Sequence, residues 1–452
     1  MRAVQRIDDE LVLSPTDLTK HLGCAHITTL DLLALDGSAT PAATDDALQL
    51  IFDLGIAHEE AYLTYLRDKG LSITTIERAT KDVSRAQREV ETLEAMRTGV
   101  DVVYQGTFYD GSWGGQADFL VRVETPSDLG PWSYEIQDTK LSRHLKVAAL
   151  LQMATYAERL TVLQGVAPDK LYVVTGDGDE KPWRLVDVSA FARLARARLR
   201  QAVDAVPVTE PVPVAQCAQC RWIDRCDAQW RRQDDLSLVA FMRGDHREAL
   251  RQHGITTLTA LGRSSAEDLP REIGRASRER LVHQASLQLW EREHRRPRYD
   301  LLHPERGQGL LRLPRPDLGD LYLDFEGDPY ADEGEGREYL AGLCGVDRLF
   351  IPLWAHSRAE ERQLTIDLVD RLLARWVEYP AMHVYHYAPY ETTALKRLVF
   401  DRHHVREEQL DQLLRGERFV ASTPSCDRGC GSAKGRTPLC QPGVMHRLVR
   451  NH

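Results

Sequence analysis

An acidic and a basic side chain stand two residues apart at the end of an apolar segment, in Glu135-Ile-Gln-Asp138-Thr-Lys140. In an extended strand, residues i and i+2 project from the same face, so Asp138 and Lys140 would point the same way. A carboxylate in this position can hold a divalent cation, and the ammonium group adds positive charge beside a phosphate. The pattern is typical of metal-dependent phosphodiester cleavage, but the motif is short and common, so its meaning depends on its neighbours.

A second carboxylate, Asp118, lies in the preceding β-rich segment, 113–123. A stretch rich in Pro, Ser and Gly separates this segment from the next one, 132–138, which predicts an antiparallel hairpin. Such a hairpin puts Asp118 almost opposite Asp138 and Thr139, with cross-strand Cβ atoms about 4.5–5.5 Å apart. Two facing carboxylates repel each other, so we expect a cation between them. The alternative is that one carboxylate points to solvent.

Three further polar side chains lie in segments with helical spacing. His58 falls within 46–69, and Gln152 and Tyr156 fall within 143–163. Gln152 and Tyr156 are four residues apart, so both project from one side of their helix. Each residue also has a simpler interpretation. A lone helical histidine is more often a surface or core residue than a metal ligand, and the other two suit a half-buried helix face.

Four of the eight cysteines have the spacing of a metal or cluster site. Cys217, Cys220 and Cys226 are close together, and Cys24 lies far upstream. Three clustered thiols and one remote thiol can complete a tetrahedral site. Such a site would close a loop of about 190 residues and hold the intervening segment together. On spacing alone, zinc fits nearly as well as an iron–sulfur cluster.

A separate set of carboxylates begins near residue 320. Asp324 and Glu326 are two residues apart in an apolar segment, so a strand would direct both to one side. This Asp-x-Glu resembles the first motif of the DEDD exonucleases, which have an RNase H-like fold. Glu391 occupies the place of that family's second motif, where an aspartate is usual. The third motif is not found, so we interpret this block as an incomplete site.

Helical and β-like segments alternate along the chain, which predicts an α/β protein. We expect a nuclease-like core with helical flanks over 1–232, a helical connector over 233–300 and a partial RNase H-like α/β domain over 315–418. The connector has short helices with glycines such as Gly262 at the joints, and it resembles helix-hairpin-helix elements; a plain connector is the alternative. Residues 419–452 lack periodicity, and we interpret them as an irregular tail that a truncation or frame shift would explain.

Composition limits the class of protein. The 452 residues are 42% hydrophobic and 28% charged, as in ordinary globular proteins of more than one domain. A net charge of −10 argues against non-specific nucleic-acid binding over the whole surface. No apolar run reaches the roughly 18 residues of a membrane span, and the N-terminus has no signal-like segment. We therefore expect a cytoplasmic location with free cysteines. The phosphate loop of an ATP motor is not found.

Taken in order, the first set of motifs resembles the PD-(D/E)XK nuclease superfamily, and within it the RecB-like exonucleases. The matching residues are Gly55-x-x-His58-Glu59, Gly115-x-x-Asp118, Asp138-x-Lys140 and Gln152-x-x-x-Tyr156. The resemblance implies a restriction-endonuclease-like core in which Mg²⁺ or Mn²⁺ is held by His58, Asp118, Asp138 and the Thr139 carbonyl. It also implies that Lys140 orients or helps to deprotonate the attacking water. Gln152 and Tyr156 would contact the nucleic-acid strand or brace the site.

The cysteines resemble those of the iron–sulfur subgroup of these nucleases, in which one cysteine precedes the core and Cys-x2-Cys-x5-Cys follows it. This resemblance implies a structural [4Fe–4S] cluster on Cys24, Cys217, Cys220 and Cys226, in preference to zinc or free thiols.

These motifs together predict a metal-dependent DNase that acts on DNA ends or single strands, in repair, recombination or end processing. One alternative is a non-catalytic DNA-binding adaptor for a separate helicase. Another is an RNase or 3′–5′ exonuclease that works through Asp324 and Glu326.

Overall fold

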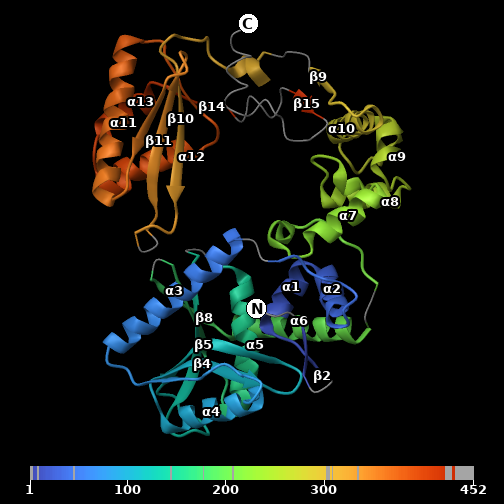
Figure 1. The fold of residues 1–452 in the computed structure, drawn as a ribbon, viewed down its shortest axis with the longest axis vertical. Helices are drawn as coiled ribbons and strands as arrows, with labels where there is room; N and C mark the ends of the chain where they lie inside the picture. The colour runs from blue at the N-terminus through green and yellow to red at the C-terminus, as the bar shows by residue number, and fades with distance from the viewer. Residues whose placement is uncertain are drawn as a thin grey trace. The chain divides into compact units, whose positions relative to one another are not determined.

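The computed structural model describes the chain except for residues 1–3, 8–9, 44–45, 143–144, 177, 206–207, 302–305, 308, 333–334, 423–429 and 433–452. It contains two compact units, Met1–Trp230 and Arg231–His452, which run from blue to green and from green to red in Figure 1. Most of the predicted irregular tail, 419–452, lies outside the described residues.

Within the described residues, a six-stranded mixed sheet forms the centre of the first unit. Its strands, in spatial order, are β3 (Ile73–Thr75), β4 (Val102–Tyr109), β5 (Gly114–Val123), β6 (Ser133–Lys140), β7 (Lys170–Thr175) and β8 (Glu180–Arg184). Strands β4, β5 and β6 are antiparallel neighbours, whereas β6 and β7 run parallel. The predicted hairpin is the β5–β6 pair, and the parallel pair requires a crossover helix.

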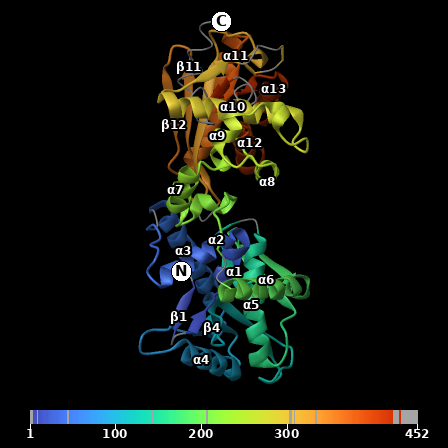
Figure 2. The ribbon, with the colours of Figure 1, turned by 90° about the vertical axis from the view of Figure 1, so that its right-hand side faces the viewer.

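Helices cover both faces of this sheet. They are α1 (Pro15–Gly23), α2 (Ala25–Leu35), α3 (Asp46–Asp68), α4 (Arg85–Thr98), α5 (Val147–Gln164) and α6 (Val186–Ala205), preceded by the ribbon β1 (Gln5–Ile7) and β2 (Glu10–Val12). Helix α5 is the crossover between β6 and β7. Helices α3 and α4 lie on opposite sides of the sheet (Figure 1), and α5 and α6 lie side by side (Figure 2).

Alternation along the strands assigns side chains to the two faces of the sheet. Leu120 and Ile136 belong to the core that α4 and α5 share, whereas Phe119 packs in a cluster with Leu63 and Leu66 of α3. Residues two apart in a strand share a face. Asp138 and Lys140 therefore lie on the same side of β6 as Ile136. The end of the hairpin therefore meets α5.

Local signals explain where the helices near the site begin and end. Ser14 and Ser84 are the N-caps of α1 and α4, and both form capping boxes. Gly165 ends α5 with φ 74°, a left-handed conformation that glycine adopts without steric cost.

The described part of the second unit contains a five-stranded sheet. Its spatial order is β12 (Phe350–Trp354), β11 (Arg337–Gly345), β10 (Leu321–Asp328), β13 (Val384–His386) and β14 (Phe419–Ala421). Strand β10 is antiparallel to β11 and parallel to β13. Strand β14 lies beyond the predicted domain end at 418. Its residues are too few to show a periodic pattern in the sequence, and they form a strand because they pair with β13.

The remaining elements of this unit are mostly helical. They include α8 (Gly244–Gln252), α9 (Leu258–Arg263), α10 (Arg275–His294), β9 (Tyr299–Leu301), α11 (Arg358–Glu378), α12 (Tyr390–Lys396), the π-helical η5 (Arg397–His403), α13 (Glu407–Arg415) and β15 (Cys430–Ser432), with α7 (Ile223–Gln233) at the unit boundary. Leu250, Leu261 and Leu281 share a core that joins α8, α9 and α10.

The predicted connector needs one correction. Gly262 lies inside α9 and not at a joint, and an added Cβ there would be 2.9 Å from the Ala285 carbonyl oxygen of α10. This glycine therefore permits close helix packing.

The two sheets with their helices confirm the expected α/β architecture. No helix in the described ranges is long and apolar enough to cross a bilayer.

Candidate active site

The register of β5 and β6 brings two predicted carboxylates together. Phe119 pairs with Gln137, so Asp118 and Asp138 are the next cross-strand neighbours. The backbone N–H of Thr139 donates to Oδ2 of Asp118 over 3.1 Å, and its hydroxyl lies 3.3 Å from the same oxygen. These contacts orient the Asp118 carboxylate toward the last residues of β6.

The charges of Asp118, Asp138 and Lys140 act on one another. The Lys140 ammonium nitrogen contacts Oδ2 of Asp138. Burial raises the pKa of Asp118 well above its usual range, and the neighbouring Asp138 carboxyl raises it further. Burial acts to lower the pKa of Lys140, but Asp138 and Asp118 outweigh burial and raise it. This pair of carboxyls therefore favours a positive partner, whether a proton, the lysine or a cation.

A third carboxylate, Glu59, approaches this group from α3 and was missing from the sequence-based set. The side-chain amide of Gln105 donates to Oε1 of Glu59. Gln105 has φ 59° and is the one position of β4 from Val102 to Tyr109 without a partner in the β4–β5 pairing, whose register continues unchanged on both sides of it. After burial and Asp138, Glu59 also contributes to the raised pKa of Asp118. The sequence signal for Glu59 is the motif Gly55-x-x-His58-Glu59, in which the resemblance implies His58 as the ligand.

His58 itself has a buried Nε2 atom that makes no hydrogen bond with any described residue. Nowhere in the described part of the chain are three or more His, Cys, Asp or Glu side chains grouped so that they could hold a metal ion. Asp138 contacts Lys140, and Glu59 is the α3 residue whose charge reaches Asp118; the ligand role of His58 stays a prediction. The types of donor nevertheless suit Mg²⁺ or Mn²⁺, since carboxylate oxygens are ligands that these hard cations prefer.

Tyr156 of α5 reaches the carboxylates from the helical side. Burial raises its pKa, and the nearby charges of Asp118 and Asp138 add to the effect. A Cβ atom at Gly115 would lie 2.8 Å from the Tyr156 ring, so this glycine allows β5 and α5 to approach closely. Gln152 lies one turn earlier on α5 and is half-buried.

The four predicted cysteine ligands line one small cavity of about 20 Å³. Cys24 is the N-cap of α2, Cys217 and Cys220 belong to the short 3₁₀ segment η1 (Ala215–Gln219) and its C-cap, and Cys226 lies in α7. All four are free thiols. Burial raises the pKa of Cys226 to about 11, and the other three cysteines add to the effect. They are therefore neighbours, although in the described residues they are not arranged as a metal group.

Asp31 of α2 anchors the loop that carries these cysteines. The Arg221 guanidinium and the Trp222 indole N–H each donate to Oδ1 of Asp31 over 2.6 Å. Asp31 is 3% exposed and the Trp222 side chain is 1% exposed. The two bonds thus join Cys220 and its neighbours to α2, the helix that Cys24 precedes as N-cap.

The second unit brings together the other predicted carboxylates. Asp324 and Glu326 of β10 pair with β11 at positions two apart and so share a face. Burial raises the pKa of Asp324, and the charges of Glu391 and Glu326 raise it further. Glu391 lies in α12, and its Oε2 is 3.4 Å from Nδ1 of His386. Three carboxylates therefore lie within electrostatic reach of one another.

Comparison with known proteins bears on the second unit. A family model of the RNase H superfamily matches residues 321–421, from the first residue of β10 to the last residue of β14. A search of curated proteins finds no match to the chain. The match confirms the RNase H-like part of the sequence-based interpretation and suggests a nuclease-type hydrolysis of phosphodiester bonds.

Proposed function

We propose that the first unit is a metal-dependent nuclease of the RecB-like PD-(D/E)XK type, which hydrolyses single strands or ends of DNA. The observation that carries this proposal is the half-buried Asp118 carboxyl beside Asp138, with Lys140 in contact with Asp138. Apolar side chains at this strand end would pack better than two carboxyls and a lysine. Packing therefore does not explain why these three residues are present.

Each side chain has a distinct task in this proposal. Asp118 and Asp138 would hold Mg²⁺ or Mn²⁺, together with the Thr139 carbonyl and either His58 or Glu59. A bound cation of this kind lowers the pKa of its water and offsets charge on the phosphate. Lys140 keeps a positive charge near the scissile phosphate and orients the attacking water. Tyr156 and Gln152 brace the site from α5.

The decisive experiment measures cleavage of labelled single-stranded DNA with Mg²⁺ or Mn²⁺. We expect Asp138→Ala and Lys140→Ala to abolish cleavage, with circular dichroism spectra like that of the unchanged chain. Asp324→Ala is the matched control, because it removes a carboxylate from the other unit. Wild-type rates for both first-unit variants would refute the assignment. Binding without cleavage in every divalent metal would favour the adaptor for a helicase.

The cysteines would hold a [4Fe–4S] cluster that staples the first unit, with zinc as the alternative occupant. Four thiols that line one cavity, from segments almost 200 residues apart in sequence, support this assignment. The measurement is the visible absorption spectrum of anaerobically purified protein, together with its iron and zinc content. Broad visible absorption with about four iron atoms per chain is expected for this cluster type. One zinc atom and a colourless protein would assign zinc instead.

The second unit offers a second candidate nuclease site, which the RNase H superfamily match favours. Asp324, Glu326 and Glu391 are the carboxylates that would serve it. Hydrolysis of single-stranded RNA that Asp324→Ala abolishes and Asp118→Ala leaves intact would assign activity to this unit. The reverse pattern on DNA would assign it to the first unit.

A further inference from the structure

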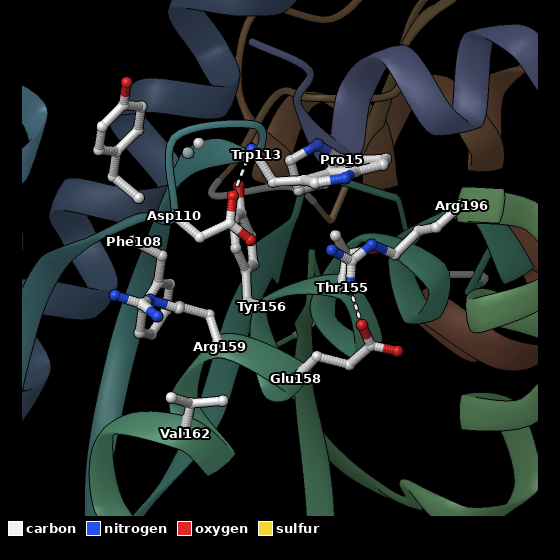
Figure 3. Close-up of a pocket in the computed structure, with 13 residues that line it drawn as sticks. Pro15, Phe108, Asp110, Trp113, Thr155, Tyr156, Glu158, Arg159, Val162 and Arg196 are labelled. Carbon is white, nitrogen blue, oxygen red and sulfur yellow. Dashed lines mark hydrogen bonds and ion pairs between the residues drawn. The ribbon is translucent and has the colours of Figure 1, made fainter. Parts of the chain in front are cut away.

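A pocket of about 170 Å³ in the first unit has Tyr156 in its lining. Residues from the β4–β5 turn, the start of α1, α5 and α6 line it (Figure 3). Gly115 and Tyr156 belong to its lining, and Tyr156 is the residue that reaches Asp118 and Asp138 from the helical side. The pocket and the proposed nuclease site therefore share one wall.

Aromatic rings form much of the lining. The rings of Phe108 and Tyr156 are 5.7 Å apart at an angle of 32°. Trp113 follows the β4–β5 turn, where its backbone N–H donates to Oδ1 of Asp110 over 2.6 Å. The guanidinium carbon of Arg196 lies 4.5 Å from the centre of the Trp113 ring. These contacts hold the rings in place before any ligand arrives.

The charges that line the pocket balance. Two acidic residues, Asp110 and Glu158, face two basic residues, Arg159 and Arg196, so the formal sum is zero. Arg196 contacts Glu158, as Figure 3 shows, and Arg159 makes a bidentate bridge of 2.8 and 2.6 Å to Glu89. A phosphate would have to compete with these carboxylates for both guanidinium groups. The lining therefore favours a neutral ligand over an anion.

In the described part of the chain, two polar atoms next to the pocket lack a hydrogen-bond partner, although neighbouring atoms cover both. The Nε of Arg196 and the Oε1 of Glu158 are buried and make no hydrogen bond with the described residues. One is a donor and the other an acceptor, and the edge of a nucleobase offers both kinds of partner. The volume is below the roughly 300 Å³ at which pockets for larger organic ligands begin, so it suits one small ring system.

We propose that this pocket binds one unpaired nucleobase of the DNA strand that the carboxylate site cleaves. The inference rests on the proposed nuclease function, because the strand is taken to pass the shared wall at Tyr156. Aromatic stacking tolerates every base, so the pocket accepts any sequence but requires that the base be unpaired. Single strands and frayed ends are accordingly preferred over intact duplex.

The test uses the full chain, in EDTA, and fluorescence anisotropy of a labelled single-stranded DNA of about 12 nucleotides. A series of such oligonucleotides carries one abasic residue at successive positions. We expect one position at which the abasic residue weakens binding about tenfold or more, and little effect elsewhere. Trp113→Ala should weaken binding of the intact strand and remove the position effect. Trp183→Ala, on β8 and 42% exposed, is the matched control.

A second variant guards against misfolding of Trp113→Ala. Val162 lines the pocket and is 70% exposed, so Val162→Trp adds an indole at the opening without disturbing the core. This variant should also lose the position effect. Equal affinity for every abasic strand, or a position effect that survives in Val162→Trp, would overturn the inference. A chain that shows the effect but never cleaves DNA would refute the nuclease function alone, and cleavage without the effect would refute the pocket assignment alone.

Discussion

The Asp118 carboxyl is held mainly by backbone and strand pairing. The N–H of Thr139 donates to it over 3.1 Å, yet burial and Asp138 still raise its pKa. Burial and the neighbouring charge of Asp138 therefore favour the protonated form of the Asp118 carboxyl. The residue-scale chemistry of the site is thus a concentration of negative charge that one lysine offsets in part.

Glu59 is the residue whose role the tertiary structure adds. We expect Glu59→Gln to lower the rate of DNA cleavage about 10- to 100-fold, because it removes a negative charge next to the carboxylate pair. The unfolding midpoint should change little. Steady-state cleavage of labelled single-stranded DNA measures the effect. Glu60→Gln is the control, since Glu60 is the exposed neighbour on α3. Equal loss of rate in both variants would show that Glu59 has no specific role.

Asp31 should stabilise the cysteine loop. Asp31→Ala leaves the Trp222 indole N–H without its acceptor and the Arg221 guanidinium without its carboxylate. We expect a loss of about 2–3 kcal/mol in the free energy of unfolding, measured by urea denaturation. Asp68→Ala, at the exposed end of α3, should change it by less than about 0.5 kcal/mol. A loss in the control as large as in Asp31→Ala would contradict this account.

At the scale of elements, the site depends on how closely β5 approaches α5. Gly115 lies on the strand and Tyr156 on the helix, and an added Cβ would be 2.8 Å from the ring. The hairpin and the crossover helix are both evident in the sequence, because alternation and helical spacing are local properties. The distance between the hairpin and the helix is not a local property of the sequence, since side chains from several segments set it.

Gly115→Ala should disturb this contact. We expect a loss of about 1–3 kcal/mol in the free energy of unfolding, since the methyl group must displace the Tyr156 ring. Gly55→Ala is the control, and it should change the free energy of unfolding in the opposite direction. Nothing lies within 4 Å of a Cβ at Gly55 in α3, and replacing a helical glycine by alanine stabilises by about 0.5–1 kcal/mol. Urea unfolding measures the free energy of unfolding of both variants. A change in the same direction in both would contradict the expected role of Gly115.

At the scale of the whole molecule, two units carry separate sets of carboxylates. Each unit has its own core, so each has its own response to pH. In the second unit, Glu361 of α11 is fully buried and ties together α11, β11 and η5. Its environment makes the stability of this unit sensitive to acid.

Glu361 should make the second unit less stable at low pH. Burial acts to raise its pKa, but the N–H of Glu338 and the charges of Arg358 and Arg402 outweigh burial and hold the pKa below its usual value. The stabilisation is therefore present above the unfolded pKa of about 4.3 and is lost as pH falls through the lower folded pKa. Thermal unfolding should show a midpoint that falls below about pH 5.

The matching variant is Glu361→Gln, which should unfold at lower temperature at neutral pH and show a shallower dependence below about pH 5. Glu378→Gln is the control, because Glu378 is exposed at the end of α11. The same steep acid dependence in Glu361→Gln would place the sensitivity on another group.

The sequence by itself determined the α/β class, the hairpin that opposes Asp118 and Asp138, and the grouping of Cys217, Cys220 and Cys226. These features follow from strand alternation, turn residues and short spacings, which act over a few residues. It also placed the RNase H-like segment, because Asp324 and Glu326 fall two apart in a strand.

Only the tertiary structure decided that Glu59 reaches Asp118, that β14 completes the second sheet, and that Trp113, Tyr156 and Arg196 surround one pocket. Each of these depends on segments far apart in the sequence that come together through core packing. No local pattern encodes such a distance, because it results from how all the buried side chains fill the space between the elements.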